Sequence, residues 1–233
     1  MYPVIKRIFD LIISLFGLMI LSPLFLTLML IIRLTSEGPV FFKQERIGIH
    51  KNHFMVYKFR TMRIDTPANI PTHLLEEPEK YITGVGRFLR ATSLDELPQL
   101  LNIIKGEMSI IGPRPALWNQ DDLVEAREKY GANDILPGLS GLAQISGRDE
   151  LPIEEKANLD GEYVEKFGFL IDVQCLFGTI FAVLKRKGVV EGKTDDSQAQ
   201  SQFEVELAKA AATTDGSQQQ QSGFESSQQP LTR

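Results

Sequence analysis

The sequence of 233 residues predicts an α+β protein that is mainly helical, and three observations predict this class. Residues 11–32 form a long apolar run. A single segment in contact with lipid must be a helix, because only a helix satisfies all its backbone hydrogen bonds internally. Residues 39–60 are rich in aromatic and β-branched residues on both sides of a short turn, which is typical of a β-hairpin. Residues 172–187 carry apolar residues at helical spacing, which predicts an amphipathic helix.

The run at 11–32 contains no charged residue. It is long enough to span a bilayer, which takes roughly 20 residues. A cleaved signal peptide is a weaker interpretation, because the run exceeds a signal core and no small-residue cleavage site follows it. Ser22 and Pro23 interrupt the run. Proline removes a backbone hydrogen bond and kinks a helix, and the Ser22 hydroxyl can satisfy a carbonyl that Pro23 leaves free.

Positive charge gathers around the apolar run. Residues 1–63 hold nine Lys and Arg against three acids. This excess favours contact with anionic headgroups or phosphates, with an ordinary solvated surface as the alternative. Lys6 and Arg7 precede the run and Arg33 follows it, so the charge rule gives no clear orientation. A kinked span and a helix that enters and leaves on one face both remain open.

The amphipathic helix at 172–187 has two interpretations. Its apolar positions are 173, 176, 177, 180, 181 and 184, and it ends in a basic triplet at 185–187. An apolar face with a basic end can lie in a membrane interface. The same pattern also suits a core helix with a favourable cationic C-terminus.

The remaining segments predict one domain followed by a tail. Composition within the ordinary globular range, 43% hydrophobic and 24% charged, allows that domain to bury a core. The single Cys175 excludes an internal disulfide, and three histidines without metal-like spacing give no support to a zinc site. Residues 195–233 are rich in Ser and Gln, hold six acids and two bases, and predict disorder without chemistry. The other expected elements are a polar loop at 64–80, helices at 94–104, 121–130 and 153–167, and a glycine-rich loop at 137–149.

The candidate chemistry lies in residues 86–115. Ser93 followed by Glu96 is a capping-box pattern, which predicts that Asp95 and Glu96 lie in the first turn of a helix. The helix dipole favours ionised carboxylates there. Such carboxylates suit metal binding or attack on phosphorus, although acids in a first helical turn are common without catalytic purpose.

Cations near these acids favour the chemical interpretation. Arg90, Lys105 and Arg114 flank the pair along the sequence. Arginine suits bidentate binding of phosphate. Pro113 and Pro115 restrict the backbone around Arg114, so that its guanidinium is presented with little loss of entropy.

These motifs resemble the bacterial sugar transferase family, the monotopic phosphoglycosyl transferases that start surface-glycan assembly on undecaprenyl phosphate. The resemblance covers about residues 4–190, and its central block is long and specific. The matching stretches are KRIFDLI (6–12), the Ser22-Pro23 break, GPVFFKQERIG (38–48), YKFRTM (57–62), SLDELPQLLNIIKGEMSIIGPRP (93–115), PGLSGLAQISGR (137–148) and the D-x-x-Y-V stretch at 160–164.

The resemblance implies a two-step transfer. Asp95 is expected to attack the β-phosphate of a UDP-sugar, release UMP and form a phosphosugar–enzyme intermediate, which polyprenyl phosphate then attacks. Glu96, with Asp95, is expected to hold Mg²⁺. Contacts to phosphate or nucleotide are expected from Lys58, Arg90, Pro113, Arg114, Pro115, Arg148 and Asp160.

The resemblance also implies where the protein works. The Ser22-Pro23 break makes residues 1–36 a re-entrant membrane helix, residues 37–194 a compact cytoplasmic catalytic domain, and 195–233 a tail. The expected location is the cytoplasmic face of the bacterial inner membrane, with interfacial helices on the lipid. Expected partners are the UDP-sugar, the polyprenyl phosphate, membrane lipids and downstream glycosyltransferases, without nucleic acid. A homodimer remains open.

Two departures and two alternatives remain. Asp149 stands where many relatives have Asn, and Leu142 where many have Trp, which bears on substrate preference. A membrane-tethered protein that binds nucleotide or lipid without turnover is the main alternative. A conventional glycosyltransferase that releases UDP has less support, because no separate nucleotide-binding βαβ pattern is found.

Overall fold

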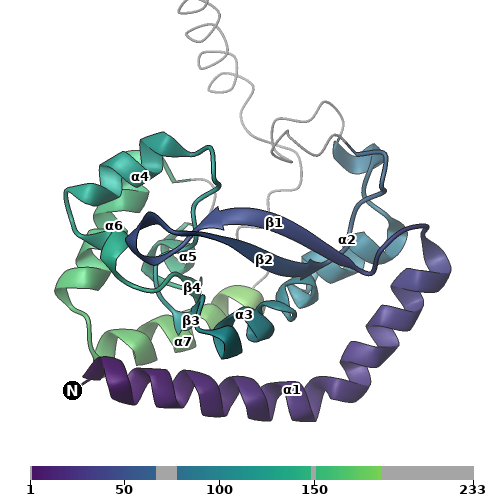
Figure 1. Ribbon diagram of the computed structural model, residues 1–233, viewed down its shortest axis with the longest axis horizontal. Helices are drawn as coiled ribbons and strands as arrows, with labels where there is room; N and C mark the ends of the chain where they lie inside the picture. The colour runs from purple at the N-terminus through teal and green to yellow at the C-terminus, as the bar shows by residue number, and fades with distance from the viewer. Residues whose placement is uncertain (1, 67–77, 148–150, 185–233) are drawn as a thin grey trace, which may run out of the picture.

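The computed structural model describes residues 2–66, 78–147 and 151–184, and it confirms a mainly helical α+β protein with a β-hairpin and a long N-terminal helix (Figure 1). The predicted helices near 121–130, 153–167 and 172–187 are confirmed. The helices and strands are α1 (Tyr2–Thr35), β1 (Phe41–Ile47), β2 (His53–Phe59), α2 (Gly84–Ala91), α3 (Gln99–Lys105), β3 (Ser109–Ile111), α4 (Asp121–Glu128), β4 (Gly138–Ser140), α5 (Leu142–Ser146), α6 (Ile153–Glu165) and α7 (Phe169–Leu184), with short 3₁₀ turns η1 (Ile49–Lys51), η3 (Pro78–Lys80), η4 (Leu94–Glu96) and η5 (Ala132–Asp134) between them.

Helix α1 continues through its proline. It lies along one edge of the molecule and bends partway along its length (Figure 1). Pro23 has no N–H to donate to the carbonyl of Met19, four residues earlier. The Ser22 hydroxyl donates to that carbonyl instead, at 2.8 Å. The predicted role of Ser22 at the break is therefore confirmed.

Both halves of α1 contact the same globular body. In the N-terminal half, the buried Asp10 accepts a hydrogen bond from the Ser109 hydroxyl at 2.7 Å. In the C-terminal half, Leu28 and Ile32 are buried in a cluster with Phe59 of the hairpin. The large apolar side chains between and around these contacts are mostly exposed. Helix α1 is long and apolar enough to cross a membrane, and within the described residues it alone meets that test.

The β1–β2 hairpin faces two ways. Its strands are antiparallel, with Phe41 opposite Phe59. Phe59 points into the cluster shared with α1 and α2. Side chains alternate along a strand, so the neighbouring Lys58 points to the other face. The face that carries Lys58 is also partly apolar, because Val56 on that face is buried in a cluster with Leu100 and Ile103.

A second sheet pairs β3 in parallel with β4. The glycine-rich segment predicted as a loop therefore contains a strand and the short helix α5, and that prediction was wrong. The backbones approach so closely that a Cβ on Gly138 would lie 2.1 Å from the Gly112 nitrogen. Glycine is required there because any side chain would collide with the neighbouring backbone.

Helix α7 exposes much of its apolar stripe. Ile171 and Cys175 are buried in a core cluster, whereas Leu176, Phe177 and Phe181 are exposed. This arrangement favours the membrane-interface interpretation over a core helix. The basic triplet at 185–187 and the tail at 195–233 lie outside the described residues, as does most of the predicted loop at 64–80.

Helix α7 begins beside the N-terminus of α1 (Figure 1). Its residue Asp172 accepts hydrogen bonds from the Tyr2 hydroxyl and from the Lys6 ammonium, each at 2.6 Å. The Tyr163 hydroxyl of α6 donates to the same carboxylate at 2.6 Å. This partly buried carboxylate therefore joins the two apolar helices to the catalytic body.

Candidate active site

The two acids lie on a 3₁₀ turn rather than in the first turn of one long helix. The predicted helix at 94–104 divides into η4 and α3, and Pro98 precedes α3. Pro98 has no N–H to continue a helical ladder back to η4. Ser93 has a left-handed backbone, with φ of 55°, and its side chain makes no capping hydrogen bond. The predicted capping box was therefore wrong.

The turn is fixed from below by apolar side chains. Leu94 and Leu97, on either side of the two acids, pack against the cluster that contains Leu28 and Ile32 of α1. The membrane helix thus supports the segment that carries the acids. Asp95 and Glu96, between these two leucines, are not part of that cluster and lie on the polar side of the turn.

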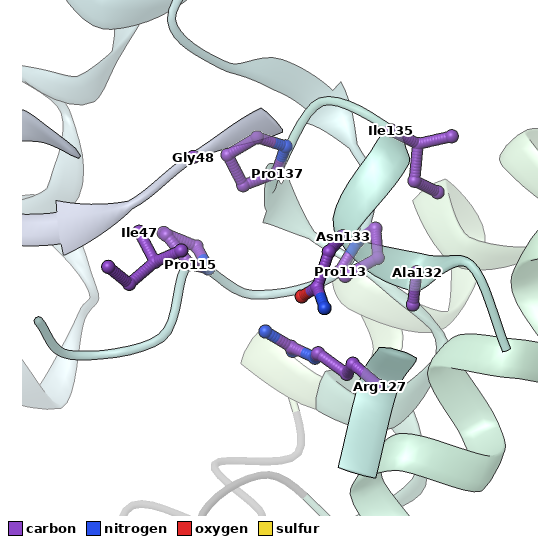
Figure 2. A pocket seen from close by; sticks show the side chains of 9 residues that line it. All are labelled: Ile47, Gly48, Pro113, Pro115, Arg127, Ala132, Asn133, Ile135 and Pro137. Carbon is purple, nitrogen blue, oxygen red and sulfur yellow. The ribbon is translucent and has the colours of Figure 1, made fainter. Parts of the chain in front are cut away.

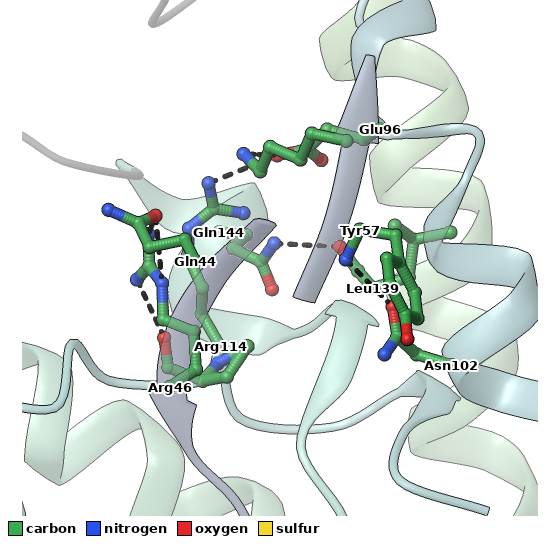
Figure 3. Close-up of polar contacts among 10 residues, drawn as sticks. Gln44, Arg46, Tyr57, Glu96, Asn102, Arg114, Leu139 and Gln144 are labelled. Atoms are coloured by element: carbon green, nitrogen blue, oxygen red, sulfur yellow. Dashed lines mark hydrogen bonds and ion pairs between the residues drawn. The ribbon is translucent and has the colours of Figure 1, made fainter. Parts of the chain in front are cut away.

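Glu96 is held by two cations. Its Oε1 accepts from the Lys58 ammonium at 2.8 Å and from the Arg114 guanidinium at 3.2 Å (Figure 3). Burial raises the pKa of Glu96, but Lys58 and Arg114 outweigh burial and bring the pKa well below its usual range. Glu96 is therefore ionised near neutral pH, as the sequence predicted, through side-chain cations rather than a helix dipole.

Asp95 has the opposite balance. Burial raises its pKa, and the charge of the adjacent Glu96 adds to that, while Lys58, Arg90 and Arg114 lower it only in part. Within the described parts of the chain, its carboxylate accepts no hydrogen bond and joins no ion pair. The expected helix dipole would lower the pKa of this residue, whereas burial and the charge of Glu96 raise it. A partly desolvated carboxylate without a hydrogen-bond partner keeps its oxygen lone pairs available for attack.

The expected cations separate into two groups. Arg90 lies in the last turn of α2, acts on Asp95, and has a buried Nη1 without a hydrogen-bond partner among the residues described. Lys105 instead donates to the Tyr57 hydroxyl at 2.7 Å and lies over its ring. Tyr57 precedes Lys58 and points to the other face of the hairpin. Lys105 therefore does not flank the acids in space.

Hydrogen bonds fix the Pro-Arg-Pro turn at 113–115. Its three carbonyl oxygens accept, in chain order, from the Gly138 N–H at 2.8 Å, from Arg127 Nη2 at 2.9 Å and from Arg46 Nη1 at 2.9 Å. Figure 3 shows Arg46 beside Gln44, to which it donates, and Arg114 reaching towards Glu96. Sequence reasoning missed Arg127 and Arg46, since nothing in their local sequence distinguishes a cation that binds backbone from one on the surface.

Two further residues named from the sequence, Asp160 and Leu142, are buried. Asp160 is 1% exposed and pairs with Arg127 through contacts of 2.6 and 2.8 Å. It therefore contacts the support of Arg114 and not the surface around Asp95. Leu142 is buried in the core cluster of α7, which points to packing at that position. Arg148, like Asp149, lies outside the described residues.

A cavity of about 10 Å³ lies behind the Pro-Arg-Pro turn and is lined in part by Arg127 and Asn133 (Figure 2). That volume suits about one water molecule and excludes a sugar nucleotide. This cavity is therefore not the binding site of a sugar nucleotide.

The donor set of the two acids fits a magnesium ion delivered with a diphosphate. Asp95 and Glu96 supply two adjacent carboxylates. No cluster of three or more His, Cys, Asp or Glu with metal-binding geometry occurs in the described ranges. Mg²⁺ commonly takes one or two carboxylates together with phosphate oxygens and water, so two carboxylates suffice when the substrate brings the rest.

Comparison with known proteins identifies the family of this chain. The bacterial sugar transferase family matches residues 1–186. The sugar transferase EpsL of Bacillus subtilis is 39% identical, over 80% of this chain and 90% of its own. The exopolysaccharide production protein ExoY of Sinorhizobium fredii is 38% identical, over 78% and 87%.

A longer relative, the undecaprenyl-phosphate galactose phosphotransferase of Salmonella typhimurium, is 36% identical over 79% of this chain and 41% of its own. The family match covers far more than half of the sequence, including every helix and strand of the described structure. The chain belongs to the bacterial sugar transferase family and is an enzyme, a phosphoglycosyl transferase.

Proposed function

We propose that this enzyme transfers a sugar 1-phosphate from a UDP-sugar to undecaprenyl phosphate or a similar polyprenyl phosphate, and releases UMP. The observation that carries the proposal is Asp95, a carboxylate without a hydrogen bond that Lys58, Arg90 and Arg114 surround. Relatives named undecaprenyl-phosphate galactose and glucose phosphotransferases support the acceptor class. Those named for exopolysaccharide production support a place early in surface-glycan assembly.

In the first step, an Asp95 oxygen forms a bond to the β-phosphorus of the donor. The bond from that phosphorus to the bridging oxygen breaks, and UMP leaves with the oxygen. In the second step, an oxygen of the acceptor phosphate attacks the same phosphorus, and the carboxylate of Asp95 leaves unchanged. The product is a polyprenyl diphosphate sugar. Two steps let one site serve a soluble donor and then a lipid acceptor.

Cations stabilise the charge that moves during both steps. Arg90 has a free buried donor for a phosphoryl oxygen, and Lys58 and Arg114 lie within reach of both acids. Fixed donors of this kind stabilise developing charge without reorganisation. Glu96 and Asp95 would hold Mg²⁺, which supplies neutralisation of the diphosphate and makes UMP a better leaving group.

The position of α1 supports a re-entrant helix. A straight helix of 34 residues is about 51 Å long, whereas a bilayer core is about 30 Å thick. A straight span would carry its two ends to opposite sides of the membrane. Here Asp10 and Ile32 both pack into one body, which is charged and cannot enter lipid. Both ends therefore lie on one face, which we assign to the cytoplasmic face of the inner membrane.

Release of UMP tests the proposal. Purified full-length protein is mixed with Mg²⁺, undecaprenyl phosphate and a panel of UDP-sugars, and nucleotides are separated by chromatography. We expect UMP with at least one donor, and loss of UMP release in Asp95→Asn by a factor of about 10⁴ or more. Asp65→Asn, which changes an exposed aspartate, serves as the control and should keep the wild-type rate.

Three results would count against the proposal. UMP release by Asp95→Asn at the wild-type rate would exclude Asp95 as the nucleophile. Release of UDP would indicate a conventional glycosyltransferase. Nucleotide binding without turnover for any donor, and without a labelled covalent intermediate, would favour the membrane-tethered binding protein.

A further inference from the structure

A buried ion pair lies behind the site and does not touch its carboxylates. Arg127 of α4 is 6% exposed and Asp160 of α6 is 1% exposed. The Arg127 guanidinium donates to one oxygen of Asp160 through both Nε and Nη2, at 2.8 and 2.6 Å. The same Nη2 donates to the carbonyl of Arg114 at 2.9 Å.

Packing alone does not explain this pair. The surroundings are apolar, since Leu123, Ala126 and Ala157 form the buried cluster between the two helices. Taking two charges out of water costs about as much as their attraction returns, so apolar residues of similar volume would hold the helices together equally well. The hydrogen bonds of a buried guanidinium are directional, however, and Arg127 donates to a single backbone oxygen, the carbonyl of Arg114.

That oxygen is the one means of holding the peptide between residues 114 and 115. Residue 115 is proline, so this peptide unit has no N–H, and its carbonyl is its only hydrogen-bonding group. The orientation of the unit depends on ψ of Arg114, which Pro115 restricts to the extended region without fixing a single value. A hydrogen bond to the carbonyl fixes that angle, and with it the direction of the Arg114 side chain.

We propose that Arg127, oriented by Asp160, is a positioning residue that holds the Arg114 guanidinium over the two carboxylates of the site. Arg114 reaches Glu96 at 3.2 Å, so contacts run from Asp160 through Arg127 and Arg114 to Glu96. The charge of Arg114 also acts on the neighbouring Asp95. This inference rests on the proposed phosphosugar transfer. It assigns Asp160 to the support of Arg114 rather than to the substrate.

A double-mutant cycle tests the inference. Arg127→Gln should lower kcat/KM for UMP release by about 10²-fold, the cost of misplacing a catalytic group by about 1 Å. In an Arg114→Gln background, the same substitution should change the rate by no more than about twofold, because the group that it positions is gone. Effects that multiply would overturn the inference. The cycle run on UMP affinity by calorimetry gives the same test without turnover.

Two variants separate positioning from general stability. Arg127→Lys keeps the charge and one donor, so it should recover part of the lost rate. Glu154→Gln breaks the exposed pair with Lys129, which joins the same region of α4 to α6, and should keep the wild-type rate. An Arg127→Lys variant no better than Arg127→Gln would contradict the inference.

A further variant keeps the test valid if Arg127→Gln does not fold. Arg127→Met combined with Asp160→Val removes both charges and leaves an apolar contact, which keeps the helices packed. Thermal unfolding checks its fold. A folded double variant with the wild-type rate and UMP affinity would overturn the inference. Absence of UMP release in the wild-type protein would instead contradict the proposed function, and the affinity cycle would still decide the role of Arg127.

Discussion

At the scale of single residues, two neighbouring carboxylates have opposite electrostatic balances. Glu96 receives direct contacts from Lys58 and Arg114, and these outweigh the cost of its burial. Asp95 feels the same cations at a distance and gains no hydrogen bond, so burial and the charge of Glu96 dominate. Glu96 is thus stabilised as an anion, whereas the anion of Asp95 is destabilised by burial and is the more reactive of the two.

These shifts predict opposite effects on stability. The pKa of Asp95 is raised in the folded state, so its ionisation above that pKa disfavours folding. Asp95→Asn should therefore raise Tm by a few degrees at pH 7, while it abolishes transfer. The pKa of Glu96 is lowered, so its charge stabilises the fold above its unfolded pKa. Glu96→Gln should cost about 1.5–3 kcal/mol, the worth of hydrogen bonds to a charged group.

Thermal unfolding of both variants in one detergent provides the measurement. The advantage of the wild type over Glu96→Gln should begin to shrink as the pH falls below the usual glutamate pKa, because the unfolded chain takes up the proton there. It should disappear only near the much lower pKa of folded Glu96. Asp65→Asn should stay within about 0.5 kcal/mol of the wild type. A lower Tm for Asp95→Asn would contradict the assigned cost of the Asp95 charge.

At the scale of elements, α1 is long and apolar enough to cross a membrane, and it also packs against the turn that carries the two acids. Ser22 repairs the hydrogen bond that Pro23 removes, which lets the helix bend without an unsatisfied carbonyl. Leu28 and Ile32 then pack beneath Leu94 and Leu97, beside the two acids. In the proposed membrane arrangement, the depth of α1 therefore sets the depth of the site.

Cysteine labelling tests the topology of α1. Single cysteines at Pro3 and Glu37, in a Cys175→Ser background, should react with a membrane-impermeant maleimide from the same side. We expect both to react in inverted vesicles and neither in intact spheroplasts. A cysteine at Met55, an exposed residue of β2, marks the side of the catalytic body. Reaction of the two ends from opposite faces would contradict re-entry.

At the scale of the whole molecule, exposed apolar side chains gather on two helices that meet at Asp172. Helix α1 and helix α7 share that junction, and both leave Phe side chains uncovered. An acceptor phosphate lies at the depth of the lipid headgroups. A body that rests on the membrane through both helices can therefore reach the acceptor without extracting the lipid.

Substitutions on α7 test this arrangement. Phe177→Glu with Phe181→Glu should weaken the contact by about 1.5–3 kcal/mol per buried side chain. We expect UMP release to fall several-fold with acceptor in vesicles and to stay near the wild-type rate in detergent. Met55→Glu changes an exposed apolar residue on β2 and is the matched control. Its rate of UMP release in vesicles should equal that of the wild type. Equal rates in vesicles would contradict a role for α7 at the membrane.

Much of the architecture could be predicted from local patterns. The hairpin, α6 and α7 follow from periodicity, and the apolar run of α1 follows from composition. The segment at 137–149 was misread as a loop because β4 needs β3, some thirty residues away, to become a strand. The helix at 94–104 was misread because the left-handed Ser93 and the position of Pro98 matter only within the packed turn.

The sequence by itself determined the class of chemistry, since an acid pair, flanking arginines and a Pro-Arg-Pro turn are local features that survive in any packing. Only the tertiary structure decided how those residues share the work. In the folded protein, Lys58 and Arg114 bind Glu96, whereas Asp95 accepts no hydrogen bond from the residues that the structure describes. Lys105 contacts Tyr57 instead of the acids, and Asp160 contacts Arg127, which binds the carbonyl of Arg114. The physical reason is that burial and charge-to-charge distance set these roles, and both arise from contacts between residues far apart in the chain.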